Sequence, residues 1–108
     1  MTTYKSLIIA IGAITASMPV HSEQALDAEG LYKERACIAC HGAEGKMPVM
    51  TEYPKIAGQP APYILAQMKD IKSGVRNNAH AVAMKNAMHL INDAEMAVIA
   101  EWLAGLPK

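Results

Sequence analysis

The sequence has few of the side chains that usually fill the core of a small domain. It contains no phenylalanine, one tryptophan and four tyrosines in 108 residues. A domain of this size is close to the limit at which an apolar core alone gives adequate stability. We therefore expect something other than aromatic side chains to supply part of the core.

An excess of charge is also missing, because ten acidic residues balance ten basic ones. Proteins that bind nucleic acid without regard to sequence use excess positive charge to neutralise phosphates. The equal numbers of acidic and basic residues therefore argue against charge-driven binding of DNA or RNA. Alternating β-branched runs long enough for a sheet are absent too, so the sequence predicts an all-α fold.

An apolar run, Ser6–Ala16, follows a short positively charged start. It is about eleven residues long, whereas a membrane-spanning helix needs roughly twenty, so it is typical of a secretory signal peptide. Small residues allow cleavage after Ala16 or Ser22, and we prefer Ser22. Residues 1–22 are thus predicted to be a cleaved signal peptide, and residues 23–108 one exported, periplasmic domain. An uncleaved membrane anchor is the alternative.

Apolar periodicity and capping signals predict three helices in the exported part, at Leu26–Ala36, Tyr63–Ser73 and Asp93–Ala104. Gly74 is expected to end the second helix, and Asn92 with Glu95 forms a capping-box pattern at the start of the third. Gly42–Pro62 is rich in glycine and proline and is predicted to be a loop. Val75–Ala83 is interpreted as a polar link.

The only two cysteines, Cys37 and Cys40, form a C-x-x-C-H motif with His41. Such a pair serves a redox disulfide, a zinc site or covalent attachment of haem. A thioredoxin-like pair needs a strand-to-helix context, and structural zinc needs four ligands, so neither suits this chain. In haem attachment the two thiols add to the vinyl groups of the porphyrin as thioethers, and the imidazole lies under the iron. We predict one covalently bound haem c, which also supplies the missing core.

Three segments resemble small class I c-type cytochromes, most of all the monohaem cytochrome c553 type and single domains of cytochrome c4. The segments are "LYKERACIACHG", "YPKIAGQPAPYILAQMKDIKSG" and "AMKNAMHLINDAEMAVIAEWLAGL", in the order found in that family. The resemblance implies three to four helices around one haem, with the first and last helices crossing at Gly30 and Trp102. Tyr32 departs from the pattern, because it stands five residues before Cys37 and related sequences often have an aromatic residue four before.

The resemblance also implies the iron ligands, which are His41 on one face of the haem and Met84 on the other. Met84 stands seven residues before Ile91, as the ligand methionine of the family stands before the leucine of its LSD segment. Met88, one turn later, is the alternative ligand. Pro48 resembles the proline whose backbone carbonyl accepts the Nδ1 proton of the axial imidazole, a contact that fixes the tautomer and the ring orientation.

Other methionines and histidines of the exported part are interpreted as core or solvated side chains, and they are Met47, Met50, Met68, Met96, His80 and His89. Met68 and Met96 lie on apolar helix stripes. Met47 and Met50 follow the motif too closely to reach the far face of the haem. Either histidine could in principle give a bis-histidine haem.

A haem iron bound by both histidine and methionine has no free coordination position for a substrate. Methionine ligation also raises the reduction potential. The sequence therefore predicts a periplasmic one-electron carrier with redox protein partners, not an enzyme. One alternative is a haem-bearing subunit of a dehydrogenase or oxidase complex. Another is an open-site haem peroxidase or gas-binding protein, for which His80 is the distal acid–base candidate.

Charge is unevenly distributed along the exported part. Glu44–Lys85 carries six basic and three acidic residues, whereas Glu23–Ala36 and Asp93–Lys108 are both acidic. The middle segment would form much of the wall around the haem. A weakly basic docking face for an acidic partner is therefore an expectation, and a surface without a preferred partner is the alternative.

Overall fold

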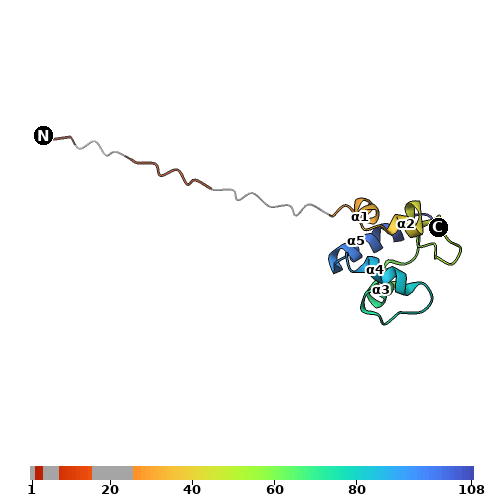
Figure 1. Ribbon diagram of the computed structural model, residues 1–108. Helices are drawn as coiled ribbons and strands as arrows, with labels where there is room; N and C mark the ends of the chain where they lie inside the picture. Colours follow the sequence, from red (N-terminus) through yellow and green to blue (C-terminus); the bar gives the residue numbers. More distant parts are fainter. Residues whose placement is uncertain (1, 4–7, 16–25) are drawn as a thin grey trace.

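The computed structural model describes residues 2–3, 8–15 and 26–108 (Figure 1). The predicted cleavage site after Ser22 lies outside these residues. Residues 8–15 form neither helix nor strand, and the helices begin at Ala28. In the described part of the chain, no helix is long and apolar enough to cross a membrane.

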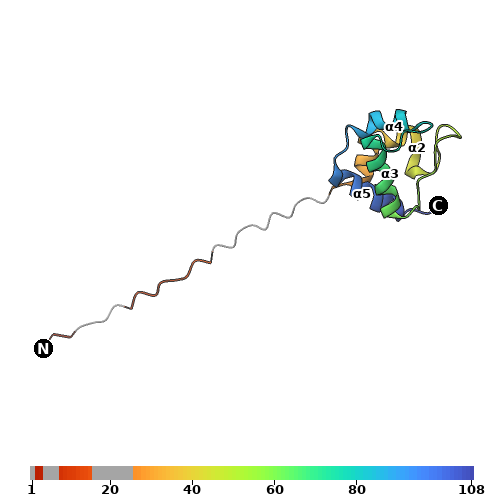
Figure 2. The same ribbon diagram turned by 90° about the horizontal axis from the view of Figure 1, so that it is seen from below.

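Residues 26–108 form five α-helices and one short 3-10 helix, without a strand. In chain order they are α1 (Ala28–Glu34), α2 (Cys37–His41), η1 (Ala43–Gly45), α3 (Ala61–Ser73), α4 (Ala81–Met88) and α5 (Asp93–Ala104). The predicted all-α fold is confirmed. Helix α5 packs against α1 and α3, and α3 also packs against α4 (Figures 1 and 2).

Buried apolar side chains from several helices form one core. The largest of those that are almost fully buried are Tyr32, Met88, Ile91, Met96, Ile99 and Leu103. Met68 is also buried, which confirms that Met68 and Met96 are core residues. Tyr32 is the one buried aromatic ring in this set, as the composition implied.

Helices α1 and α5 meet at an aromatic pair. The rings of Tyr32 and Trp102 lie with centroids 5.2 Å apart, and the Tyr32 hydroxyl donates to the Gly42 carbonyl oxygen at 2.6 Å. Burial raises the pKa of Tyr32 to about 12, so the hydroxyl remains a donor. The contact confirms Trp102 as a residue of the interface between the first and last helices.

Gly30 takes part in the capping of α1. Asp27 caps α1, and its carboxylate accepts the Gly30 N–H at 3.1 Å. The three atoms nearest to a Cβ added at Gly30 belong to this Asp27 side chain. The small size of Gly30 therefore leaves room for the cap. Its place at the helix crossing stays a prediction.

The first predicted helix, Leu26–Ala36, ends at Glu34, and Ala36 separates it from a second short helix, α2. Ala36 adopts the left-handed conformation with φ 64°, which an alanine rarely takes because its Cβ crowds the following carbonyl. Helix α1 therefore ends at Glu34 and α2 starts anew at Cys37. The break lets α2 take its own direction, with Cys37 half-buried and Cys40 exposed.

Helix α4 is not among the predicted helices. Its N-cap is His80, whose side chain makes no capping hydrogen bond, so the usual start signal is missing. Ala81 and Met88 are its buried residues, which gives it a narrow apolar stripe. The interpretation of Val75–Ala83 as a link is therefore wrong from Ala81 onward.

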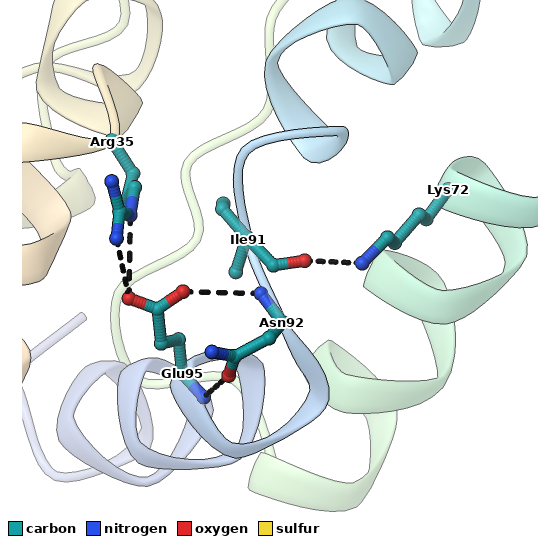
Figure 3. A network of polar contacts seen from close by, with 5 residues as sticks. All are labelled: Arg35, Lys72, Ile91, Asn92 and Glu95. Atoms are coloured by element: carbon teal, nitrogen blue, oxygen red, sulfur yellow. Dashed lines mark hydrogen bonds and ion pairs between the residues drawn. The ribbon is translucent and has the colours of Figure 1, made fainter.

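A network of polar contacts joins the start of α5 to α1 and α3 (Figure 3). The Asn92 side chain accepts the Glu95 N–H at 2.8 Å and Glu95 accepts the Asn92 N–H at 3.1 Å, which confirms the capping box. Arg35 donates to Glu95 Oε2 from Nη2 at 2.8 Å and from Nε at 3.3 Å. Lys72 donates to the Ile91 carbonyl oxygen. One carboxylate thus links residues sixty positions apart in the chain.

Glu95 should make the stability of the fold sensitive to acid. Its hydrogen bonds with Arg35 and Asn92 hold its pKa below the ordinary value. A carboxyl group with a lowered folded pKa stabilises the fold above its unfolded pKa of about 4.3. That contribution is lost as the pH falls through the folded pKa.

We expect Glu95→Gln to lower Tm at neutral pH and to flatten its decline on acidification. Thermal unfolding followed by circular dichroism between about pH 7 and pH 3 measures both effects. Glu101→Gln is the matched control, because Glu101 is exposed on the same helix. Parallel Tm curves for the wild type and Glu95→Gln would contradict the prediction.

Candidate functional site

Helix α2 presents the C-x-x-C-H motif to the interior. Cys37 is half-buried and Cys40 exposed, both are free thiols, and both line a hollow together with His41. Burial raises the pKa of Cys37 to about 11, so this sulfur is a neutral thiol at neutral pH. Within the described residues, no three His, Cys, Asp or Glu side chains come together as a metal site. The arrangement therefore does not fit structural zinc.

The hollow has a volume of about 270 Å³ and mainly apolar walls. Helix α2 packs against α1 and η1, whereas α4 packs against α3, and side chains of all these helices except η1 line the space. Apolar lining residues from α3, α4 and α5 include Ile64, Met68, Met84, Met88, Ile99 and Leu103. An apolar space with two thiols and an imidazole on one helix fits a covalently attached porphyrin.

His41 is buried and held by one backbone group. Its Nδ1 lies 3.0 Å from the Pro54 carbonyl oxygen, and burial lowers the pKa of His41, with the Pro54 bond acting in the other direction. A neutral imidazole bonded in this way carries its proton on Nδ1. The lone pair of Nε2 is then free for a metal.

The carbonyl that meets His41 belongs to Pro54, so the prediction of Pro48 is wrong. The chain turns back directly after the motif, where the Val49 N–H donates to the Cys40 carbonyl oxygen at 3.0 Å. Pro48 therefore lies beside a residue that is bonded to the end of α2. The chain reaches the His41 ring six residues later, at Pro54.

Both candidate methionine ligands line the hollow. Met84 is half-buried and Met88 is 2% exposed, and they stand one turn apart on α4. The structure thus brings the predicted ligand and its alternative to the same space as His41. Met47 and Met50 are exposed and do not line the hollow.

Two histidines were weighed as alternative ligands or acid–base groups. His89 is exposed and does not line the hollow. His80 is also exposed but lines it, and its ring meets the edge of Tyr53 with centroids 5.3 Å apart. His80 therefore lies beside the hollow, whereas His89 is not part of its lining.

Polar groups of the hollow that sequence reasoning missed come from two loops and α3. Pro54 is one, and Arg76 with its partner Gln67 is another, joined by a hydrogen bond of 3.1 Å. A signal for Arg76 was present, because it is an isolated basic residue within the otherwise uncharged stretch Ser73–Met84. No comparable signal marks Pro54 among the prolines of its loop.

A small helical domain that offers two thiols, an Nε2-free imidazole and methionine sulfur to one apolar hollow is a c-type cytochrome. The chain belongs to the cytochrome c family, whose model matches residues 25–107. The protein accordingly binds haem c covalently. These findings confirm the predicted cofactor and the predicted class.

Three relatives illustrate the match. Cytochrome c4 of Pseudomonas aeruginosa is 40% identical over 77 residues, which is 71% of this chain and 36% of that protein. A thiosulfate dehydrogenase electron acceptor of Thiomonas intermedia is 39% identical over 72 residues, or 67% of this chain and 33% of that protein. Cytochrome c-553 of Nitratidesulfovibrio vulgaris is 25% identical over 99 residues, covering 92% of this chain and 97% of that protein. The chain thus spans about a third of the first two and nearly all of the third.

Proposed function

We propose that the protein is a periplasmic one-electron carrier. In this proposal the haem is attached through Cys37 and Cys40, and its iron is bound by His41 and Met84. The observation that supports it best is that all four side chains line one mainly apolar hollow, with His41 Nδ1 already engaged by Pro54.

The haem supplies iron that changes reversibly between two oxidation states, and the protein sets the conditions of that change. Pro54 holds the His41 ring so that Nε2 points away from the bonded side. Met84 offers a soft, neutral thioether, which favours ferrous iron and raises the potential. The apolar lining limits access of water and acts in the same direction.

We propose a carrier rather than an enzyme because the iron would have no free coordination position. With His41 and Met84 both bound, no position is left for a substrate. An open-site peroxidase or gas-binding protein would need the Met84 position free and an acid–base group beside it. His80 lines the hollow and is the residue that would serve there.

Export and free diffusion are further parts of the proposal. The apolar run Ser6–Ala16 supports export, with cleavage after Ser22. One relative is named as an electron acceptor of thiosulfate dehydrogenase, which supports a carrier that serves an enzyme and equally a haem subunit bound to one. A haem-stained sizing column on periplasmic extract separates these forms. Elution as a small haem protein supports the carrier, and elution with a large assembly supports the subunit.

Basic side chains next to the haem hollow support docking of an acidic redox partner. Lys46, Lys55, Gln59 and Lys108 surround a second hollow, and Lys55 and Gln59 line the haem hollow as well. Long-range attraction between opposite charges speeds association and weakens as salt rises. Positive charge at Lys55 would thus act close to the cofactor.

We expect reduced protein to transfer electrons to hexacyanoferrate(III), an anion, at a rate that falls several-fold between about 10 mM and 500 mM salt. Lys55→Gln should lower the low-salt rate and the salt dependence. The exposed Lys69 lines neither hollow, so Lys69→Gln is the matched control. Electron-transfer rates that do not change with ionic strength would contradict the proposed docking face.

A further inference from the structure

Helix α4 carries Met84 in its first turn and is attached to the rest of the fold at both ends. Along its length it packs against α3. At its C-terminal end, Lys72 of α3 donates to the carbonyl oxygen of Ile91 (Figure 3). At its N-terminal end the ring of His80 meets the ring of Tyr53, with centroids 5.3 Å apart and planes at 84°. This second contact joins α4 to the loop before α3.

The loop that holds Tyr53 belongs to the His41 side of the site. Tyr53 is half-buried and directly precedes Pro54, whose carbonyl oxygen lies 3.0 Å from His41 Nδ1. The His80 carbonyl oxygen accepts the Met84 N–H at 3.3 Å, so these two residues share the first turn of α4. Tyr53 and His80 both line the haem hollow. The ring pair thus connects the segment that positions His41 with the segment that carries Met84.

The backbone directly before His80 has an unfavourable conformation. Ala79 has a φ of 48°, in the left-handed region that an alanine rarely takes. Such a conformation persists only when the surrounding structure holds it. The His80 side chain makes no capping hydrogen bond, and its contact is with the ring of Tyr53. Loss of that contact would let Ala79 and His80 relax, and the start of α4 would move with them.

We propose that the Tyr53–His80 ring pair is a latch that keeps the start of α4, and Met84 with it, against the haem iron. This inference rests on the proposed binding of the iron by Met84. Tyr53 and His80 act through Met84 and are therefore positioning residues. The latch sets how often the methionine sulfur leaves the iron, and thereby how well the iron is protected from small ligands.

Cyanide is a suitable probe of the latch, because it binds the ferric iron only while Met84 is dissociated. Removing a contact that exists only in the closed form raises the population of the open form. In Tyr53→Leu and in His80→Leu we expect cyanide to bind about two- to tenfold faster, the range that an edge-to-face ring pair supplies. The double variant should be no faster than either single variant, because the same contact is lost in all three. Tyr53→Phe and His80→Phe keep a ring and should react at nearly the wild-type rate.

Stopped-flow mixing of the ferric holoprotein with cyanide at fixed pH measures these rates. His89→Leu and Tyr63→Leu are the matched controls, since His89 is exposed at the other end of α4 and Tyr63 lines the hollow from α3. Wild-type rates in Tyr53→Leu and His80→Leu, or effects that add in the double variant, would overturn the latch. A rate in His80→Phe as fast as in His80→Leu would overturn it too. The far-red band of the same samples tests Met84 separately, and its absence from the wild type would overturn the proposed function itself.

A measurement on the wild type covers the case in which the leucine variants do not fold. Nuclear Overhauser effects between the ring protons of Tyr53 and His80 in the ferrous holoprotein show whether the rings meet when the haem is in place. Rings with centroids 5.3 Å apart should give such cross-peaks. Their absence would contradict the latch.

Discussion

Replacing both Cys37 and Cys40 by alanine is expected to abolish haem staining of the denatured protein. Both thiols line the hollow from α2, one half-buried and one exposed, which places them where thioethers to one porphyrin edge can form. Without either bond, denaturation releases the cofactor, so the loss on a denaturing gel should be complete. Each single variant keeps one possible thioether and should keep part of the stain.

The same double variant should also fold poorly. The hollow of about 270 Å³ lies among the core side chains and has mainly apolar walls. Unfilled apolar space in a core destabilises a domain, and a domain this small has little stability to lose. If acidified organic solvent extracts the haem from intact wild-type protein, covalent attachment is wrong.

Replacing Met84 by alanine is expected to open the iron and lower its potential. Thioether sulfur is a soft, neutral donor that prefers ferrous iron, and it gives ferric haem a weak sulfur-to-iron band in the far red. The variant should lose this band and bind carbon monoxide or cyanide quickly. Its potential should fall by on the order of 100 mV, which is more than tenfold in the equilibrium constant.

Met88→Leu is the matched control, because Met88 lines the same hollow one turn further along α4. Leucine has a similar volume and no sulfur, so the band should persist and the potential should change little. Met84→Ala should also destabilise the fold less than loss of the haem does, since the thioethers and His41 remain. If Met84→Ala keeps both the band and the potential, Met88 or another residue is the ligand.

Helices with strong local signals could be predicted from the sequence. Helix α5 runs from Asp93 to Ala104 as expected, because its capping box at Asn92 and its apolar stripe point to the same boundaries. Helix α3 ends at Gly74 as expected, and that glycine has the left-handed φ of 86°. It starts two residues earlier than predicted, since Pro62 fits the first helical turn.

Features that depend on the haem hollow could not be predicted from the sequence in the same way. Met84 of α4 lines the haem hollow. No apolar pattern in the sequence marks its side chain as inward-facing. The path of the loop after His41 depends on turns at Gly42 and Gly45, both with positive φ. Spacing along the chain therefore pointed to Pro48, whereas the fold brings Pro54 to the imidazole.

The candidate site was predictable where chemistry is local and unpredictable where it depends on the fold. Cys37, Cys40 and His41 are fixed together by one short helix, so the motif alone predicts that they lie close together. Met84 reaches the hollow as the resemblance implied. Arg76 and Gln67 are nine residues apart and meet only because the chain turns after α3, which residue spacing does not reveal.

The far-red absorption spectrum of the ferric wild-type protein tests the central claim most directly. The claim is that the haem iron is closed by His41 and by methionine sulfur from α4, which makes the protein a carrier of electrons. The account predicts the weak sulfur-to-iron band, with no change when carbon monoxide is added to the reduced form. Absence of the band, together with rapid binding of carbon monoxide, would show an open iron and contradict the account.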